Sequence, residues 1–198
     1  MKKNDFLEAL NALKKGEPIV YPTDTLYALG ADIYNKNAVK KIFDIKQRPY
    51  SIPLPVAVPS IQAIETIAYM NDIAYKISNK FLPGTLTIIL KKKSIVPDTI
   101  TSGTDTIAVR IPNHSIALHL LSEFGPLTVT SANIHHQETQ GTIIDIRKQL
   151  RNDIAIWLND GKLVMVPSTI IDLSSKIPKI IRQGLITEKE LFNVINHE

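Results

Sequence analysis

Two short polar segments near the start of the chain carry residues that could bind a small hydroxylated molecule beside a polyphosphate. Residues 21–30 read YPTDTLYALG, which places hydroxyls and a carboxylate where an apolar strand should turn. Residues 46–49 read KQRP, so Lys46 and Arg48 lie two positions apart and Pro49 biases the preceding backbone towards an extended conformation. This combination predicts a ligand cleft, and therefore an enzyme.

The two threonines of the first segment would share one side of an extended chain. Thr23 and Thr25 are separated by one residue, so an extended backbone would point both the same way with Asp24 opposite. A polar strand edge followed by an ordinary turn is the alternative interpretation of the same residues.

An arginine stands within an apolar strand further along the chain. Thr106, Ala108 and Arg110 alternate with apolar residues and would share one face of a strand over 106–111. Arginine at such a position is either exposed on an edge strand or paired with an anion, and a carboxylate ligand would suit its guanidinium group. Both interpretations remain open at the level of sequence.

A third polar group follows the apolar run 127–129. Thr130, Ser131 and Asn133 come where a strand should end, which is where α/β sheets bind ligands, although such residues also form ordinary turns. The neighbouring His135 and His136 have no obvious third ligand, so we expect no metal site there.

Hydrophobic periodicity predicts alternating helices and strands along the whole chain. The first predicted helix begins at Phe6 and is stopped by Gly16. Further predicted helices cover 38–46, 71–81, 114–124 and 143–150, with a last one that begins at a capping box of Thr187 and Glu190. The predicted strands cover 18–21, 54–58, 86–90, 106–111, 127–130, 154–158, 168–173 and 179–182. Prolines around 54–58 favour a sheet edge or a short strand. We therefore expect a single α/β domain over 1–198, with a twisted mixed sheet and flanking helices.

Composition narrows the functional classes. The 198 residues are 44% hydrophobic and 21% charged, with a formal charge of +4 that is too small for a dedicated nucleic-acid binder. The absence of cysteine excludes disulfides, thiol catalysis and cysteine-ligated zinc. Neither a P-loop nor a Gly-x-Gly-x-x-Gly motif occurs, so a phosphate site would need lysine, arginine, hydroxyls and backbone amides. No apolar run approaches the roughly 18–20 residues of a membrane span, the N-terminus does not resemble a signal peptide, and we expect a cytoplasmic protein.

Seven motifs occur together in one order. They are YPTDTLYALG at 21–30, KQRP at 46–49 with PL at 53–54, PGTLT at 83–87, DTIAVRIPNH at 105–114, GPLTVTSAN at 125–133, PSTIID at 167–172 and IIRQG at 180–184. With this ordered set the chain resembles the YrdC family of threonylcarbamoyl-AMP synthases over nearly its whole length, in the short single-domain form. The resemblance implies a YrdC-like fold with a central basic cavity.

The resemblance also implies a reaction and its site. L-threonine, bicarbonate and ATP, the last with magnesium, would give threonylcarbamoyl-AMP and pyrophosphate for the modification of a tRNA adenosine by a separate threonylcarbamoyl transferase complex. Thr23 and Arg110 match family contacts to L-threonine, and Lys46 and Arg48 match the catalytic pair that lines the phosphate cavity. The matched ATP-binding residues are Lys46, Arg48, Thr106, Ser131, Asn133, Thr139 and Arg182.

Two alternatives remain. A YrdC-like module that binds double-stranded RNA or tRNA would use a basic concave face, but the chain has no dense stripe of lysine, arginine and aromatic residues. A paralogue with an altered substrate would keep the fold. The YciO type diverges from the family at the KxR and SAN motifs, both of which this chain retains.

Overall fold

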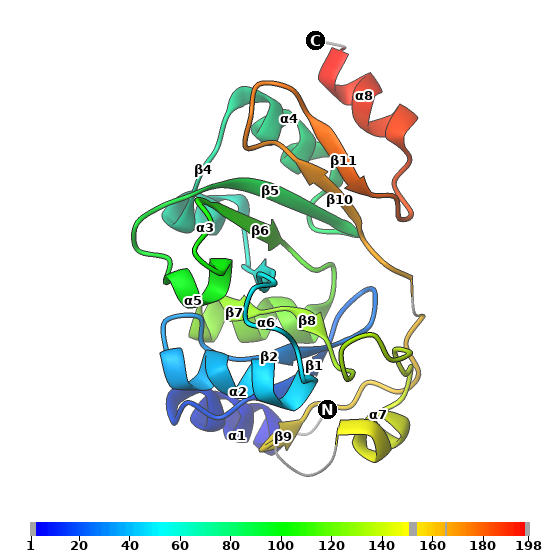
Figure 1. The fold of residues 1–198 in the computed structure, drawn as a ribbon. Coiled ribbons are helices and arrows are strands. Elements are labelled where there is room, and N and C mark those ends of the chain that lie inside the picture. Colours follow the sequence, from blue (N-terminus) through cyan, green and yellow to red (C-terminus); the bar gives the residue numbers. More distant parts are fainter. Residues whose placement is uncertain (1–2, 151–153, 165, 197–198) are drawn as a thin grey trace.

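The computed structural model describes residues 3–150, 154–164 and 166–196, and it contains two β-sheets with helices packed around them (Figure 1). The predicted α/β class with mixed sheets is confirmed, but the strands form two sheets rather than one. Met1 and Lys2, which begin the N-terminal segment that does not resemble a signal peptide, lie outside the described residues.

The smaller sheet contains the first polar segment. Its strand order is β8-β2-β1-β9, and the strands are β1 (Ile19–Pro22), β2 (Tyr27–Gly30), β8 (Thr130–Ser131) and β9 (Ile156–Trp157). Helices α1 (Lys3–Lys14), α2 (Lys36–Lys46), α6 (Ser115–Phe124) and α7 (Ile143–Leu150) lie in the same lower half of Figure 1. Strands β1 and β2 pair antiparallel, so residues 23–26 form the turn between two buried strands.

The larger sheet has the order β11-β10-β5-β6-β3-β7, and β4 pairs with β5 outside this path. Its strands are β3 (Val56–Ala57), β4 (Ala68–Tyr69), β5 (Leu86–Lys92), β6 (Thr106–Arg110), β7 (Leu127–Thr128), β10 (Thr169–Asp172) and β11 (Lys179–Arg182). Helices α3 (Ile61–Ile67), α4 (Asp72–Phe81), α5 (Asp98–Thr101) and α8 (Glu188–Asn196) complete this part of the fold.

One short segment belongs to both sheets. We predicted a single strand over 127–130, but β7 pairs with β3 in the larger sheet and β8 pairs with β2 in the smaller one. Between them, the Val129 amide donates a hydrogen bond to the Pro55 carbonyl at 2.9 Å. The polar residues that follow β7 are therefore held where the two sheets meet.

Helix α2 ends at the second polar segment for local reasons. Asn35 caps its start by accepting hydrogen bonds from the Asn37 and Ala38 amides, and its buried face includes Ile42 and Phe43. At the other end Gln47 adopts a left-handed conformation with φ of 51°, which stops the helix and turns the chain. Lys46 is consequently the last helical residue.

The predicted helices and strands are present, with differences at particular elements. The capping box at α8 is confirmed, because the Thr187 amide donates to Glu190 at 2.8 Å and the Glu190 amide donates back to Thr187 at 3.3 Å. Of the two alternatives predicted over 54–58, the short strand is confirmed because β3 has two residues, and the sheet edge is wrong since β3 lies between β6 and β7. Strands β2 and β4 and helices α3 and α5 were not predicted.

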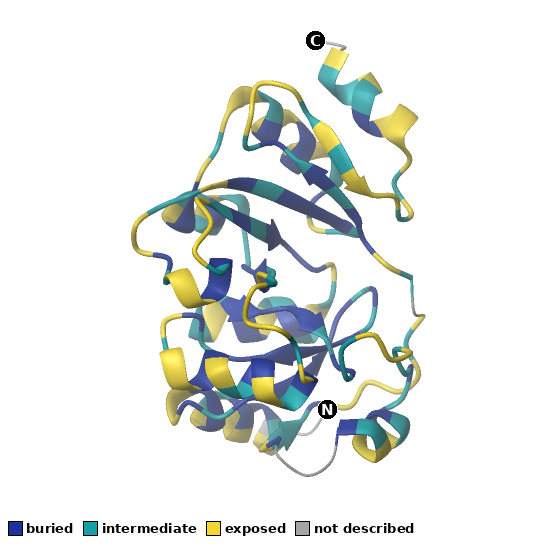
Figure 2. Cartoon of the chain, viewed as in Figure 1, coloured by how far each residue is buried: buried dark blue, intermediate teal, exposed yellow. Residues whose placement is uncertain are grey.

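Burial follows the two sheets. The inner strands of both sheets are largely buried, whereas edge strand β11 and the outer faces of α1 and α2 are exposed (Figure 2). One apolar cluster includes Ile88, Val109 and Ile42, and a second packs α1 and α6 against β1 through residues such as Leu13 and Leu120. None of the described helices has the length and apolar character needed to cross a membrane.

Candidate functional site

Residues from both sheets line a cavity of about 480 Å³. Five of the residues predicted from sequence lie on its wall: Arg48, Arg110, Ser131, Thr139 and Arg182. They come from the turn after α2, from β6, from β8, from the loop before α7 and from β11. Residues that are far apart in the sequence therefore share one cavity.

Arg110 is buried and paired with a carboxylate. It ends β6, which lies between β5 and β3, so the alternative of an exposed edge-strand arginine is wrong. Its Nη2 atom contacts Asp24 Oδ1 at 2.7 Å and the Gly84 carbonyl at 3.1 Å, and its Nη1 donates to Thr25 Oγ1 at 2.8 Å. Burial lowers the pKa of Arg110, and Asp24 opposes that shift.

The threonine turn places Thr25, rather than Thr23, against Arg110. Thr23 is 1% exposed, and its Oγ1 donates to the Leu26 carbonyl at 2.6 Å and accepts from the Leu26 amide at 3.1 Å. It also lies 3.0 Å from Thr25 Oγ1. The backbone turns here, so the expectation that Asp24 points away from both threonines is wrong: Asp24 and Thr25 contact the same guanidinium group.

Lys46 is enclosed behind the cavity wall. Its ammonium nitrogen contacts the Ser131 carbonyl, the Asn133 carbonyl at 2.9 Å and Asn133 Oδ1 at 2.9 Å. Ser131 Oγ also donates to Asn133 Oδ1, at 2.6 Å. Burial, reinforced by nearby Arg48, lowers the pKa of Lys46 to about 7. Lys46 and Asn133 are therefore connected to the cavity through Ser131, which lines it.

Arg48 is fixed by the proline-rich loop that follows it. Its Nε donates to the Ile52 carbonyl at 3.1 Å and its Nη2 donates to the Pro53 carbonyl at 2.8 Å. Arg48 begins this loop, and Ile52 and Pro53 lie further along it, so the loop itself holds the guanidinium group at the cavity. Burial lowers the pKa of Arg48.

Arg182, on the edge strand β11 of the larger sheet, is likewise held by a backbone carbonyl. Its Nη2 donates to the Ser168 carbonyl at 2.8 Å and contacts Ser168 Oγ at 3.2 Å, and its Nε donates to the same carbonyl at 3.1 Å. Gly184 allows this approach, because a Cβ atom there would overlap the backbone of Pro167 and Thr169. Burial lowers the pKa of Arg182.

The larger sheet contributes an apolar wall next to these cations. Ile89, Ala108, Ile170 and Ile181 line the cavity from four adjacent strands, β5, β6, β10 and β11. Thr106 shares the face of Ala108 and Arg110 through the strand alternation but is not among the residues that line the cavity. The cavity thus combines a flat apolar surface with a group of cations.

The charges around the cavity are unevenly compensated. Among the ion pairs of the described residues, Arg110 has a carboxylate partner, whereas Lys46, Arg48 and Arg182 contact only carbonyl or hydroxyl oxygens and the Asn133 amide oxygen. Lys46 is buried, Arg48 is half-buried and Arg182 is exposed, and a bound polyanion would supply the counter-charge that all three lack. The arrangement is suited to binding phosphates.

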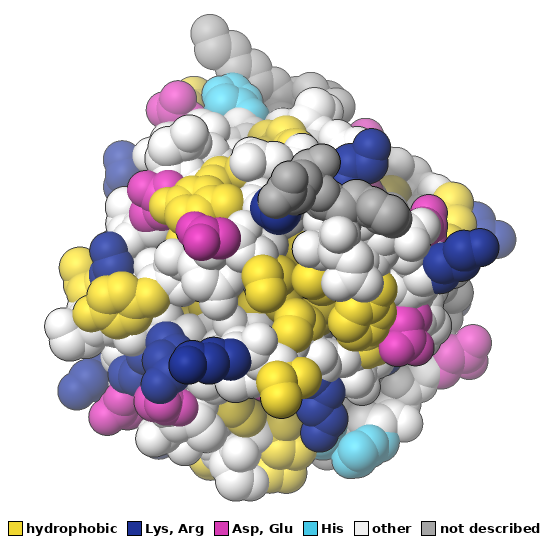
Figure 3. All heavy atoms as spheres, turned by 90° about the horizontal axis from the view of Figure 1, so that it is seen from above, with side chains coloured by type: hydrophobic (Ala, Val, Ile, Leu, Met, Phe, Trp, Pro, Cys, Tyr) yellow, Lys and Arg dark blue, Asp and Glu magenta, His cyan; other side chains and the backbone are white. Residues whose placement is uncertain are grey.

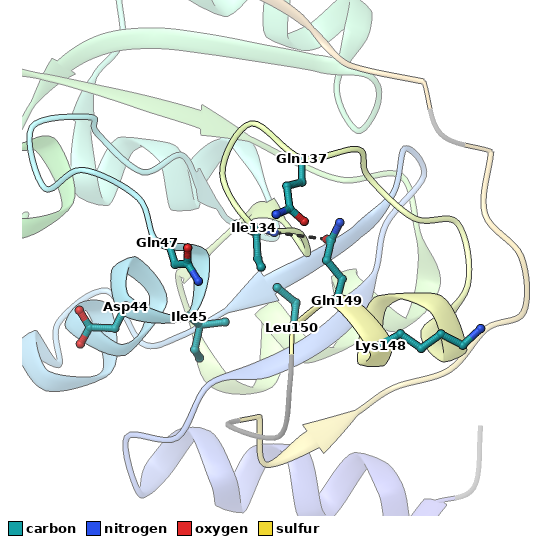
Figure 4. Close-up of a pocket in the computed structure, with 8 residues that line it drawn as sticks. All are labelled: Asp44, Ile45, Gln47, Ile134, Gln137, Lys148, Gln149 and Leu150. Carbon is teal, nitrogen blue, oxygen red and sulfur yellow. Dashed lines mark hydrogen bonds between the residues drawn. The ribbon is translucent and has the colours of Figure 1, made fainter.

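A second cavity of about 470 Å³ lies between the end of α2, the turn after Asn133 and the end of α7 (Figure 4). Gln149 Oε1 accepts a hydrogen bond from the Ile134 amide at 3.3 Å across it. On the same turn the rings of His135 and His136 have centroids 3.9 Å apart and are tilted by 39°, and His136 has a φ of 65°. No group of three or more described His, Asp or Glu side chains is placed to hold a metal ion.

The end of the molecule that carries α8 exposes hydrophobic side chains on its surface. Seen from above, hydrophobic side chains gather near the middle of this face, with lysine and arginine side chains towards its margin (Figure 3). Ile177, Ile181 and Leu185, on β11 and its flanks, are exposed by 79%, 50% and 57%. Of these, Ile181 also lines the cavity of Arg48 and Arg110.

Asp24, Thr25 and the apolar wall were missed as site residues by sequence reasoning. Asp24 was assigned to the opposite side of an extended chain, and only the turn brings it to Arg110. The preference of a buried arginine for an anion was the available signal, but it did not say that the anion belongs to the protein. Ile89 and Ile170 read as ordinary strand residues.

Comparisons with known proteins identify similar chains. The Sua5/YciO/YrdC family, described as telomere recombination, matches residues 11–184. A Methanocaldococcus jannaschii protein is 40% identical over 189 residues, which cover 93% of this chain and 89% of that protein. The threonylcarbamoyl-AMP synthase of Pyrococcus abyssi is 36% identical, over 94% of this chain and 56% of its own length.

Solved structures of proteins named Sua5 and YciO also match this chain. The crystal structure of Pyrococcus abyssi Sua5 complexed with L-threonine matches 98% of this chain with a TM-score of 0.93 and 34% identity. The chain covers 58% of that protein, so it spans little more than half of the longer relatives. Escherichia coli YciO matches with a TM-score of 0.88 and 30% identity over 96% of this chain and 94% of its own.

Proposed function

This chain belongs to the Sua5/YciO/YrdC family, and from that membership we propose that it is an L-threonylcarbamoyladenylate synthase. It combines L-threonine, bicarbonate and ATP into threonylcarbamoyl-AMP and pyrophosphate, as a nucleotidyltransferase that supplies tRNA threonylcarbamoylation. The observation that carries the proposal is the cavity where Arg48, Arg110 and Arg182 meet. The threonine complex of the Pyrococcus abyssi protein supports an amino-acid substrate in a cavity of this fold.

The cavity divides the substrates between its parts. The triphosphate lies towards Arg48 and Arg182, whose hydrogen bonds to backbone carbonyls leave their charge uncompensated. The nucleobase lies on the apolar wall formed by Ile89, Ala108 and Ile170, with Thr106 further along the same face. L-threonine lies at the Arg110 end, where Thr25 holds the guanidinium group and Thr23 fixes the turn.

The reaction requires positioning and charge stabilisation rather than a protein nucleophile. Threonine first forms a carbamate with bicarbonate, one carbamate oxygen attacks the α-phosphate, and pyrophosphate leaves with the electrons of the broken bond. Negative charge that develops on the phosphate oxygens is stabilised by Arg48 and Arg182, and by Lys46 through Ser131. Asn133 holds the loop that borders the phosphates by donating to the Gln137 carbonyl at 2.6 Å, and Thr139 lines the cavity from that loop. Magnesium comes with ATP, bridging its phosphates.

The proposal extends to the setting of the reaction. The short-lived mixed anhydride is passed to a separate threonylcarbamoyl transferase complex, with weak direct contact to tRNA at most. We place the protein in the cytoplasm, and we take residues 1–198 to act as one YrdC-like domain. The relatives it only half covers carry additional chain, so their further activities are not transferred.

Calorimetry of L-threonine and ATP, each alone and then together, tests this function, with L-serine as the control. We expect saturable binding of threonine and of ATP, threonine binding that serine does not reproduce, and pyrophosphate release only when threonine and bicarbonate are both present. RNA binding with a steep salt dependence and no response to threonine would favour an RNA-binding module instead.

A further inference from the structure

The ion pair between Asp24 and Arg110 leaves two polar atoms without hydrogen-bond partners. The side chains are 12% and 6% exposed, and their contact of 2.7 Å uses Asp24 Oδ1 and Arg110 Nη2. Within the described part of the chain, Asp24 Oδ2 and Arg110 Nε are buried and unpartnered. An unsatisfied buried polar group costs about 1–3 kcal/mol, so two in a single ion pair indicate a missing ligand.

The two atoms are chemically complementary. Asp24 Oδ2 is an anionic acceptor and Arg110 Nε is a donor on a cation, and the pair as a whole carries no net charge. Arg110 and Thr25 line the cavity, and Asp24, which is not itself a lining residue, lies next to that wall through its contact with Arg110. A ligand that satisfies both atoms needs a cationic donor and an anionic acceptor close together, which is the pattern of an α-amino acid in its zwitterionic form.

We propose that Asp24 binds the α-ammonium group of the amino-acid substrate while Arg110 binds its carboxylate. This assignment rests on the function proposed above and adds a specificity-determining residue to it. An arginine without a counter-ion would bind any small carboxylate. The neutral pair instead selects amino acids, because an acid without the ammonium group leaves Asp24 unsatisfied and faces its negative charge.

The electrostatic interaction between Asp24 and the substrate nitrogen changes from attraction to repulsion during the reaction. The ammonium nitrogen loses a proton to solvent and forms a bond to the bicarbonate carbon as water leaves, so R–NH₃⁺ and HCO₃⁻ give R–NH–COO⁻, H₂O and H⁺. The substrate nitrogen, which Asp24 attracted, now carries an anionic group that Asp24 repels. The carbamate is thereby favoured on the side of the cavity where Arg48 and Arg182 lie, next to the α-phosphate.

Ligand discrimination by the Asp24→Asn variant tests this role. Binding of L-threonine is compared with that of its hydroxy acid analogue, in which a hydroxyl replaces the ammonium group. Wild-type protein prefers threonine by at least about tenfold, the lower limit for a charge-assisted hydrogen bond. In the variant the threonine affinity falls by that factor, the analogue binds at least as tightly as before because the negative charge of Asp24 is gone, and the ratio approaches one.

The control variant is Asp172→Asn. Asp172 ends β10, its carboxylate accepts hydrogen bonds from the Ser174 amide and hydroxyl, and Arg110 forms its ion pair with Asp24 and not with Asp172. This variant keeps the wild-type preference. Unchanged ATP binding by Asp24→Asn shows that the variant is folded. An equal loss of affinity for both ligands would mean that Asp24 acts only by positioning Arg110, and would overturn the proposal.

Wild-type protein alone gives a second measurement, which does not depend on how well the variant folds. If it binds the hydroxy acid as tightly as threonine, Asp24 has no role in recognising the ammonium group and the inference fails. If it binds threonine but not serine, and binds the hydroxy acid as tightly as threonine, the proposed function stands and only this inference falls. If it binds neither threonine nor ATP, the proposed function itself is wrong.

Discussion

The two ends of the cavity compensate their cations in opposite ways. At one end Arg110 is paired with Asp24 at 2.7 Å, and both side chains are almost fully buried. At the other end Arg48 and Arg182 contact the carbonyls of Ile52, Pro53 and Ser168. Backbone carbonyls orient a guanidinium group without neutralising it, whereas a carboxylate does both.

The difference separates two ligand classes within one cavity. A neutral pair provides hydrogen-bonding geometry with little net attraction for a polyanion, which suits a small zwitterion. Oriented cations with no counter-ion attract several negative charges at once, which suits a triphosphate. A molecule that carries both kinds of group, one at each end, is aligned between the two ends of this cavity of about 480 Å³.

Replacement of Arg110 should have the largest effect, because it acts on the fold as well as the ligand. Arg110→Ala leaves Asp24 as a buried charge without a partner, a change that costs about 3–5 kcal/mol of unfolding free energy. We expect a clear fall in the midpoint of denaturant unfolding together with loss of threonine binding. The ion pair with Asp24 is the reason that stability should fall together with threonine binding.

A double variant separates the two effects of that change. Arg110→Ala combined with Asp24→Ala removes both charges, so much of the lost stability should return while threonine binding stays absent. If the double variant is as unstable as Arg110→Ala, the loss comes from packing and not from the unpaired carboxylate.

Replacement of Arg48 should have a smaller effect that is confined to ATP. Arg48→Ala removes one charge-assisted contact to phosphate, worth about 1.5–3 kcal/mol, without stranding any carboxylate. We expect ATP affinity to fall by about ten- to 150-fold, pyrophosphate release to fall with it, and unfolding free energy and threonine affinity to change little. Calorimetry and denaturant titration measure these quantities on the same sample. Equal losses of threonine and ATP affinity would erase the distinction between the two ends.

Much of the fold could be predicted from local patterns, and the exceptions have physical causes. The capping box of α8 and the stop at Gly16 depend on residues a few positions apart, so sequence contains them. The division of 127–131 between two sheets does not follow from its composition, because β7 and β8 find partners that are distant in sequence. Strand β3 could not be recognised as internal, since its two neighbours come from later in the chain.

The candidate site was predictable in its members more than in its contacts. Ordered motifs brought Arg48, Arg110, Ser131 and Arg182 together, and the structure places all four at one cavity. The pairing of Arg110 with Asp24 depends on a turn that alternation along an extended strand does not describe. Likewise, a lysine at a helix end reads as exposed, whereas Lys46 is 1% exposed.

The smallest predicted effect concerns Lys46 and the pH dependence of ATP binding. Burial and Arg48 lower the pKa of Lys46 to about 7, so the free protein loses this charge as the pH rises above 7. Bound phosphates favour the charged form and raise that pKa, which means that ATP binding above pH 7 must take up a proton. ATP affinity attributable to Lys46 should therefore be greatest below pH 7 and should decline above it, approaching tenfold per pH unit.

Comparison with Lys46→Met isolates this contribution from the titration of ATP itself. Calorimetry between pH 6 and pH 9 in buffers of different ionisation enthalpy reports both the affinity and the protons taken up. Proton uptake in the wild-type protein that disappears in Lys46→Met would show that Lys46 responds to the phosphates although Ser131 and Asn133 enclose its ammonium group. The same proton uptake in both proteins would instead show that the cations at the phosphate end act without Lys46. Only Arg48 and Arg182 would then distinguish that end of the cavity from the Asp24–Arg110 pair.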